Sequence, residues 1–237
     1  MNEINKIRKI TIWIFLIPFV SINLCLLIAI FHTTLDGTIF QVDVTGRLNY
    51  SIPYFTGGFS ISRAARAYPS YFIFKPFMVI TSLLLIKYWM LNKNLINNFG
   101  DIDKSKYFVF FGVGSAIFLI FHSLMLGMKF DLSFLKFFRR FVLVAFIIFE
   151  IVAQTILIIN LIKLKNKINI LINKNILFYK SILVTVLIIV AFLSIPILAS
   201  DEYKSLKHAL EWNYFVGVVL FYFLTRLLWK KTLGHTP

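Results

Sequence analysis

The sequence predicts an all-α fold, a single polytopic membrane bundle of six transmembrane helices that covers residues 1–237. Two observations predict it. First, 59% of the 237 residues are hydrophobic, which is more than a soluble domain usually carries. Second, apolar runs of about twenty residues recur along the chain, which is the length that crosses ~30 Å of hydrocarbon.

The six expected spans run over residues 10–31, 71–91, 107–126, 138–162, 178–199 and 208–229. The first follows Lys6, Arg8 and Lys9 and therefore resembles a signal peptide. Its apolar run is too long for a signal peptide and no small-residue cleavage site follows, so we interpret it as a transmembrane helix.

The distribution of Lys and Arg predicts the orientation. If the N-terminus is inside, fifteen of the 25 basic residues lie on the inner side and ten on the outer side, which favours cytoplasmic N- and C-termini. The net charge of +15 is then expected to face anionic lipid rather than nucleic acid. The membrane would be the plasma membrane in a bacterium, and an endomembrane such as the ER, Golgi or lysosome in a eukaryote. Whether the Asn49 sequon in the outer loop is glycosylated stays open.

Residues 33–70 form the longest connection and are expected outside. The segment "TIFQVDVTGRLNYSI" alternates apolar and polar residues around Gly46, which predicts a short β-hairpin. The pair Gly57-Gly58 permits backbone angles that other residues avoid, and it allows a partner to approach the main chain closely.

Ser60, Ser62, Arg63 and Arg66 follow these glycines. On a helical turn the two arginines share a face, and guanidiniums beside hydroxyls and loop amides suit a phosphate group. These residues are therefore candidates for binding a phosphorylated headgroup. Two alternatives remain: nonspecific contact with lipid headgroups at the membrane interface, or a purely structural role.

Polar side chains also occur inside the expected spans. Glu150 lies about twelve residues into the fourth span, and Gln154 follows one turn later on the same face. An ionisable group at this depth is costly and is usually paired or functional. Glu150 is either a neutral acid hydrogen-bonded to another helix or a proton-exchanging or catalytic acid. His122 is a further polar residue, near the outer end of the third span.

His208 and Glu211 open the sixth span at positions i and i+3, on one helix face. A histidine with a carboxylate partner is the arrangement that a general base and its orienting group require, so they are the candidate catalytic residues. The alternative is an ordinary interfacial pair. The single cysteine and the four histidines show no structural zinc spacing, and we expect neither a metal nor another cofactor.

Two segments resemble the Frag/DRAM/Sfk family of six-span membrane proteins. In the outer loop they are Ile52-Pro53-Tyr54, Ser60-Ile61-Ser62-Arg63, Tyr68-Pro69 and Ile73-Phe74, and in the last span "HALEWNYFVGVVLFYFLTRL" at 208–227 is similar to the family's closing helix. That family includes the factor that remodels the lipid of GPI anchors and the membrane half of a GPI-ceramide remodelling protein. Arg63-Ala64-Ala65-Arg66 stands where the family's loop continues with an aspartate, so the substrate headgroup stays open.

The resemblance implies a protein that binds or remodels a lipid or a lipid-anchored glycan at the outer or lumenal leaflet. Its expected partners are membrane lipids, with a phosphorylated headgroup as the candidate ligand; protein partners are not predicted. Two alternatives stand beside it: a non-catalytic membrane adaptor or trafficking regulator, and a proton-coupled small-molecule transporter that uses Glu150. Whether the protein is an enzyme is open at this point.

Overall fold

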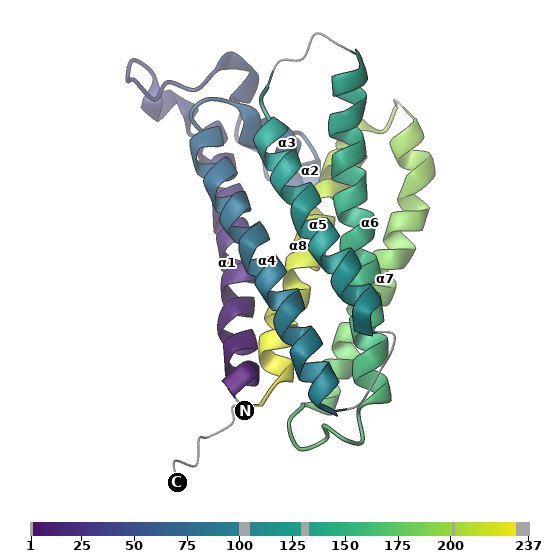
Figure 1. Cartoon of the computed structure of the whole chain (residues 1–237). Helices are drawn as coiled ribbons and strands as arrows, with labels where there is room; N and C mark the ends of the chain where they lie inside the picture. The colour runs from purple at the N-terminus through teal and green to yellow at the C-terminus, as the bar shows by residue number, and fades with distance from the viewer. Residues whose placement is uncertain (1, 100–104, 129–132, 201, 231–237) are drawn as a thin grey trace.

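The computed structural model describes residues 2–99, 105–128, 133–200 and 202–230, and within these ranges it contains helices and no strands (Figure 1). Six helices are long: α1 (Asn2–Ile30), α4 (Tyr71–Phe99), α5 (Ser105–Met125), α6 (Ser133–Lys163), α7 (Lys174–Ala199) and α8 (Lys204–Leu228). Four short ones lie between α1 and α4: η1 (His32–Leu35), η2 (Val44–Gly46), α2 (Pro53–Thr56) and α3 (Ile61–Arg66). The predicted all-α bundle is confirmed.

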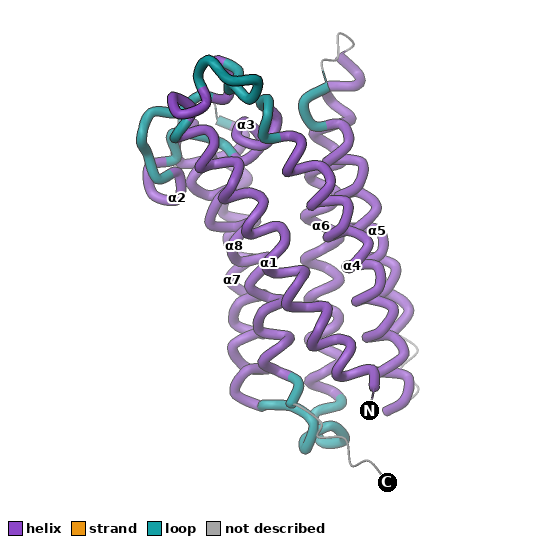
Figure 2. Tube along the Cα trace, turned by 90° about the vertical axis from the view of Figure 1, so that its left-hand side faces the viewer, coloured by secondary structure: helices purple, strands orange, loops and turns teal. Residues whose placement is uncertain are grey.

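The six long helices form a closed ring in which each packs mainly against two others, in the order α1, α4, α5, α6, α7, α8 and back to α1. The segment between α1 and α4 gathers at one end of the ring, which we call the loop end (Figure 2). The start of α1 and the end of α8 lie at the opposite end, the terminal end (Figures 1 and 2).

The first and last helices are joined at the terminal end. A guanidinium nitrogen of Arg8 donates to the carbonyl oxygen of Trp229, and Arg226 donates to the carbonyl of Arg8 at 3.3 Å. The backbone N–H of Asn173, just before α7, donates to the carbonyl of Leu228 at 2.8 Å. Carbonyl groups that the end of α8 would otherwise leave unpaired are thus satisfied by neighbours in space.

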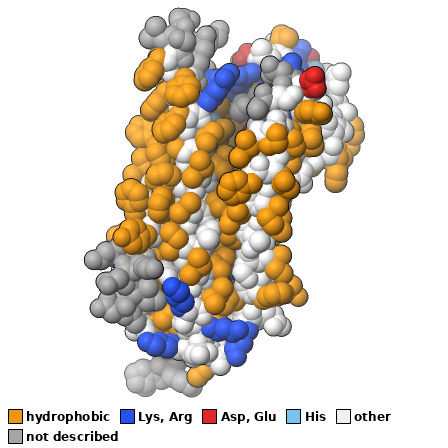
Figure 3. All heavy atoms as spheres, turned by 90° about the vertical axis from the view of Figure 1, so that its right-hand side faces the viewer, with side chains coloured by type: hydrophobic (Ala, Val, Ile, Leu, Met, Phe, Trp, Pro, Cys, Tyr) orange, Lys and Arg blue, Asp and Glu red, His pale blue; other side chains and the backbone are white. Residues whose placement is uncertain are grey.

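Five helices are long and apolar enough to cross a membrane: α1, α4, α5, α6 and α7. One face of the molecule carries hydrophobic side chains over its middle, with Lys and Arg gathered towards its two ends (Figure 3). The protein is therefore a multi-pass integral membrane protein. The sixth expected span corresponds to α8, which packs between α1 and α7 but does not have the composition of a span, because polar and charged residues occupy its first turns.

Aromatic side chains fill the interior of the ring. Tyr88 and Trp89 of α4 and Tyr222 of α8 are almost completely buried. The rings of Tyr88 and Tyr222 meet edge to face with centroids 5.1 Å apart, an arrangement that aromatic quadrupoles favour. Since α1 separates α4 from α8 in the ring order, this contact joins two helices across the interior of the ring.

The expected β-hairpin around Gly46 is absent from this described segment, and residues 44–46 form a 3₁₀ turn instead. The backbone N–H of Gly46 bonds to the carbonyl of Asp43 at 2.8 Å, and Asp43 bonds through its N–H to the carbonyl of Tyr68 at 3.3 Å. The Arg47 side chain turns back to the carbonyl of Val42 at 3.0 Å. These local and tertiary bonds take the backbone groups that a strand ladder would need.

Candidate functional site

Residues 51–66, which we call the cover, fold over the first turns of α8 at the loop end. Pro53 opens α2, where its missing N–H costs nothing because the first N–H groups of a helix have no internal partner. Gly57 ends α2 in the left-handed conformation. Ser60 then caps α3 by accepting a bond from the Arg63 N–H at 3.2 Å.

Three side chains of α8 hold the backbone of the cover. The Nδ2 of Asn213 donates to the carbonyl of Tyr54 at 2.8 Å. The Nδ1 of His208 lies 2.9 Å from the carbonyl oxygen of Gly57, and the buried indole of Trp212 donates to the carbonyl of Phe59 at 2.7 Å. These bonds fix the conformation of the cover relative to α8.

Gly57 is the tightest point of this contact. Its φ is +61°, and a Cβ placed on it would lie 1.6 Å from the carbonyl oxygen of Ser205. Only glycine satisfies both conditions. The close approach that the sequence predicted for the glycine pair is therefore present at Gly57, and the partner is the main chain of α8. Gly58 has more room, since its Cβ would lie 3.3 Å from the Ser51 hydroxyl.

The cover is also anchored to α1. The Tyr54 hydroxyl donates to Oδ1 of Asn23 at 3.0 Å, and its ring centroid lies 4.9 Å from that of Trp212. Burial raises the pKa of the Tyr54 phenol, with the bond to Asn23 acting in the opposite direction. Tyr54 therefore stays a neutral hydrogen-bond donor at neutral pH.

His208 is oriented by the cover. Because a carbonyl oxygen only accepts, the neutral imidazole carries its proton on Nδ1, and Nε2 has the free lone pair. Within the described residues Nε2 makes no hydrogen bond. The ring therefore has the tautomer and the fixed orientation that a general base needs.

Glu211 does not orient His208, contrary to the expected pairing. Its Oε1 accepts the backbone N–H of Ser62 at 3.3 Å. His208 and Glu211, on consecutive turns of α8, thus each bond to a different backbone group of the cover, the Gly57 carbonyl and the Ser62 N–H. The hydroxyls of Ser60 and Ser62 lie 3.4 Å apart, beside the Glu211 contact.

The two candidate arginines are exposed, and neither forms an ion pair with Glu211. The Nε of Arg63 donates to the carbonyl of Thr45 at 2.8 Å, and its guanidinium carbon lies 5.1 Å from the centroid of the Phe59 ring. Stacking and a single backbone bond leave the outer guanidinium nitrogens of Arg63 available.

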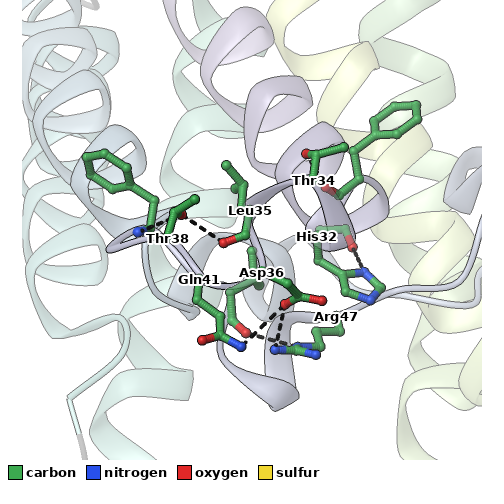
Figure 4. Close-up of polar contacts among 11 residues, drawn as sticks. His32, Thr34, Leu35, Asp36, Thr38, Gln41 and Arg47 are labelled. Carbon is green, nitrogen blue, oxygen red and sulfur yellow. Dashed lines mark hydrogen bonds and ion pairs between the residues drawn. The ribbon is translucent and has the colours of Figure 1, made fainter.

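The first half of the connection is held by its own polar contacts (Figure 4). Arg47 and Asp36 form an ion pair at 3.1 Å, and the amide of Gln41 donates to the same Asp36 oxygen at 3.4 Å. The Nδ1 of His32 lies 3.2 Å from the carbonyl of Ala29. His32 is thus a second histidine bonded to the backbone, in a different part of the loop end.

A second polar cluster lies inside the bundle, around Glu150. Its carboxyl group accepts bonds from the Ser115 hydroxyl at 2.6 Å, from the Gln154 amide at 2.8 Å and from the Tyr222 hydroxyl. The donors come from α5, α6 and α8, and Glu150 is 1% exposed. It faces other helices, as its depth in the sequence predicted. His122 is also buried, but its Nδ1 has no partner among the described residues.

Lys180 was not predicted as a site residue. It lies in the first turns of a helix that follows a connecting loop, where a lysine usually reaches water. Instead it is completely buried, and its Nζ donates to the Thr225 hydroxyl at 2.5 Å. Two features of the sequence could have indicated its burial. Lys180 lies six residues after the start of α7 (Lys174–Ala199), and a possible polar partner, Thr225, lies near the end of the last helix.

Comparison with known proteins identifies no relative: no protein-family model, no curated protein and no solved structure matches the chain.

Proposed function

We propose that the protein binds a lipid with a phosphorylated headgroup, or a lipid-anchored glycan, at the outer or lumenal leaflet, and remodels it with His208 as the base. The cover carries the proposal. This segment, at one end of a membrane bundle, presents two exposed arginines and two serine hydroxyls, and its Gly57 carbonyl orients His208 at the start of α8.

Charge and topology support this assignment. With cytoplasmic termini, as the bias of Lys and Arg favours, the loop end faces the outer leaflet. Arg63 and Arg66 then stand at headgroup depth, and neither forms an ion pair with a carboxylate among the described residues. An exposed guanidinium at that depth bonds to phosphate in a bidentate manner, and the bilayer supplies the acyl chains by lateral diffusion.

His208 supplies the chemical part of the proposal. Its Nδ1 bond to the Gly57 carbonyl plays the part that a carboxylate plays in other oriented bases, and Nε2 is the atom that would accept the proton of an attacking hydroxyl or water. Ser60 and Ser62 would donate to the same headgroup.

Binding is tested with the purified full chain in nanodiscs. Phosphatidic acid is the probe, and diacylglycerol with the same acyl chains is the control lipid. Arg63→Gln and Arg66→Gln are each expected to weaken phosphatidic acid binding by about tenfold, as loss of a charged hydrogen bond does. Arg140→Gln, which removes an exposed arginine at the start of α6, is expected to change nothing. Equal binding of the two lipids by the wild type would contradict the proposal.

Remodelling is tested by mass spectrometry of the acyl chains of the bound lipid over time. His208→Ala is expected to stop acyl exchange while the lipid stays bound. His32→Ala, which removes the other histidine bonded to a backbone carbonyl, is the matched control and should exchange normally. Retention of a phosphorylated lipid without any exchange in the wild type would favour the non-catalytic adaptor instead.

A further inference from the structure

The short helix α2 of the cover lies beside the bundle rather than above it. It packs against α8, and Figure 2 shows it at the flank of the loop-end turns of the long helices. The hydroxyl of Tyr54 donates to Oδ1 of Asn23 in α1 at 3.0 Å. The carbonyl of Tyr54 accepts from Nδ2 of Asn213 in α8 at 2.8 Å. Two long helices thus fix the depth of α2.

The depth of Asn23 in the membrane follows from the sequence of α1. The chain carries no Asp, Glu, Lys or Arg between Lys9 and Asp36, and α1 is apolar enough to span a membrane as far as Ile30. From Ile10 to Ile30 the helix rises about 30 Å, which is the thickness of the hydrocarbon core. Asn23 precedes Ile30 by seven residues, so it lies about 10 Å inside that core.

Exposed apolar side chains surround this depth. On α1, Leu24, Leu27 and Phe31 are exposed, although they follow Asn23 towards the loop end. On α2, Phe55 is 85% exposed, and Ile52, three residues earlier and on the same side, is exposed as well. Exposed apolar patches of this kind mark a membrane or partner contact, and the patch on α2 lies at the depth of the lipid-facing surface of α1.

The backbone of α2 has the hydrogen bonds that a hydrocarbon environment requires. Pro53 at its start has no N–H, and the N–H of Gly57 at its end donates to the carbonyl of Pro53 at 3.0 Å. The carbonyls of Tyr54 and Gly57 are bonded by the α8 side chains of Asn213 and His208. Unpaired backbone groups are very costly in hydrocarbon, and these bonds remove that cost.

We propose that α2 is inserted into the membrane leaflet at the loop end, with Ile52 and Phe55 in contact with lipid acyl chains. The partner is the hydrocarbon of the bilayer rather than a particular headgroup. The cover is then held from two sides, by α8 through hydrogen bonds and by lipid through apolar contact. The proposal makes no use of Arg63, Arg66 or the chemistry assigned to His208, so it stands or falls independently of the proposed function.

The first test measures depth with spin labels on introduced cysteines, in the full chain in phosphatidylcholine nanodiscs. Phe55→Cys is compared with Leu27→Cys, on the lipid-facing side of α1, and with Val44→Cys. Val44 is 80% exposed but lies next to Asp43 in the polar part of the connection. The native Cys25 is buried, and wild type carried through the same labelling gives the background. Collisions with oxygen, which dissolves in hydrocarbon, are compared with collisions with a water-soluble nickel chelate.

The label at position 55 should collide with the nickel chelate at least about tenfold less often than the label at position 44, because a hydrated polar complex is excluded from hydrocarbon. Its collisions with oxygen should match those at position 27. Nickel collisions as frequent as at position 44 would place α2 in water and overturn the proposal. Few collisions with either reagent would show that protein, such as a second copy of the chain, covers Phe55, and would equally contradict lipid contact.

The second test asks whether lipid contact holds α2 in place. Phe55→Asp would put a carboxylate into hydrocarbon, which is costly. We therefore expect α2 to leave the leaflet, and protease to cut the cover in nanodiscs at least about tenfold faster than in the wild type. Val44→Asp introduces the same charge at a similarly exposed position and should be cut at the wild-type rate. Equal rates for the two variants would show that α2 is not held by lipid.

Discussion

Two glutamates at different depths of this protein are bonded in different ways. Glu150 lies in the interior of the helix ring and accepts only side-chain donors, from three helices. Glu211 lies in the third turn of α8, partly exposed, and accepts a backbone N–H of the cover. The first contact specifies how long helices pack against one another, whereas the second specifies where a loop lies.

The difference shows how this chain uses polar groups. In the bundle, buried hydroxyl and amide groups such as those of Ser82 and Asn92 donate to carbonyls of their own helix, but the Glu150 carboxyl group needs donors and finds them on side chains, because the helical N–H groups are already bonded. At the loop end, the irregular backbone of the cover has free carbonyls and N–H groups, so α8 side chains bond to the main chain. Loss of a bundle contact should therefore orphan several groups at once, and loss of a cover contact only one.

The largest effect is expected for Glu150→Ala. The substitution leaves the donors of Ser115, Gln154 and Tyr222 buried without an acceptor, and breaking such a network should cost about 3–5 kcal/mol. Thermal unfolding in detergent measures the change. Glu150→Gln keeps one acceptor oxygen, so its unfolding temperature should fall clearly less than that of Glu150→Ala. If Glu150→Ala unfolds at the wild-type temperature, the cluster does not stabilise the helix packing.

The next effect is expected at the cover. Gly57→Ala would place a methyl group against the Ser205 carbonyl at a positive φ, and overpacking of this kind should cost about 1–3 kcal/mol. The cover should detach from α8 and become sensitive to protease, while the bundle remains folded. Gly58→Ala is the matched control in the neighbouring position and should stay resistant. Equal sensitivity of the two variants would mean that the cover is not held at Gly57.

The sequence predicted the bundle well, because the length of an apolar run is a direct consequence of the thickness of a membrane. The expected span at 71–91 lies within α4 (Tyr71–Phe99), for example. The helix is longer than the expected span, because its last residues, which include polar ones, continue the helix beyond residue 91. The alternation of apolar and polar residues around Gly46 wrongly predicted a hairpin. The backbone N–H of Asp43 bonds to the carbonyl of Tyr68, a distant partner that no local pattern reveals.

The candidate site was predicted only in part. Gly57 and Gly58 indicated a close approach, but not that its partner is Ser205 in α8. Glu150 was identified because a charge in a long apolar run stands out. Lys180 was not, because a lysine close to a helix end is usually a solvated one, and its burial depends on the position of Thr225 in another helix.

A smaller effect is expected for Trp212→Phe. The substitution keeps most of the buried ring but removes the indole N–H that donates to the Phe59 carbonyl, which should cost about 1 kcal/mol. Trp229→Phe provides the control, because the indole nitrogen of Trp229 is buried without a partner among the described residues. Thermal unfolding of the two variants should therefore differ, with Trp212→Phe the less stable. The reverse order would contradict the role assigned to this bond.

The smallest effect is expected for Glu211→Gln, and it is the sharpest test of the comparison. The amide keeps an oxygen that accepts the Ser62 N–H, so the contact with the cover should survive with a change within about 0.5 kcal/mol, the usual range for surface substitutions. If Glu211 were instead held by a cation such as Arg63 or Arg66, loss of its charge would detach the cover. Protease sensitivity of the cover distinguishes the two, with Glu202→Gln, an exposed carboxylate in the same region, as the control. A cover that becomes accessible in Glu211→Gln but not in Glu202→Gln would show that charge rather than backbone bonding holds this end of α8.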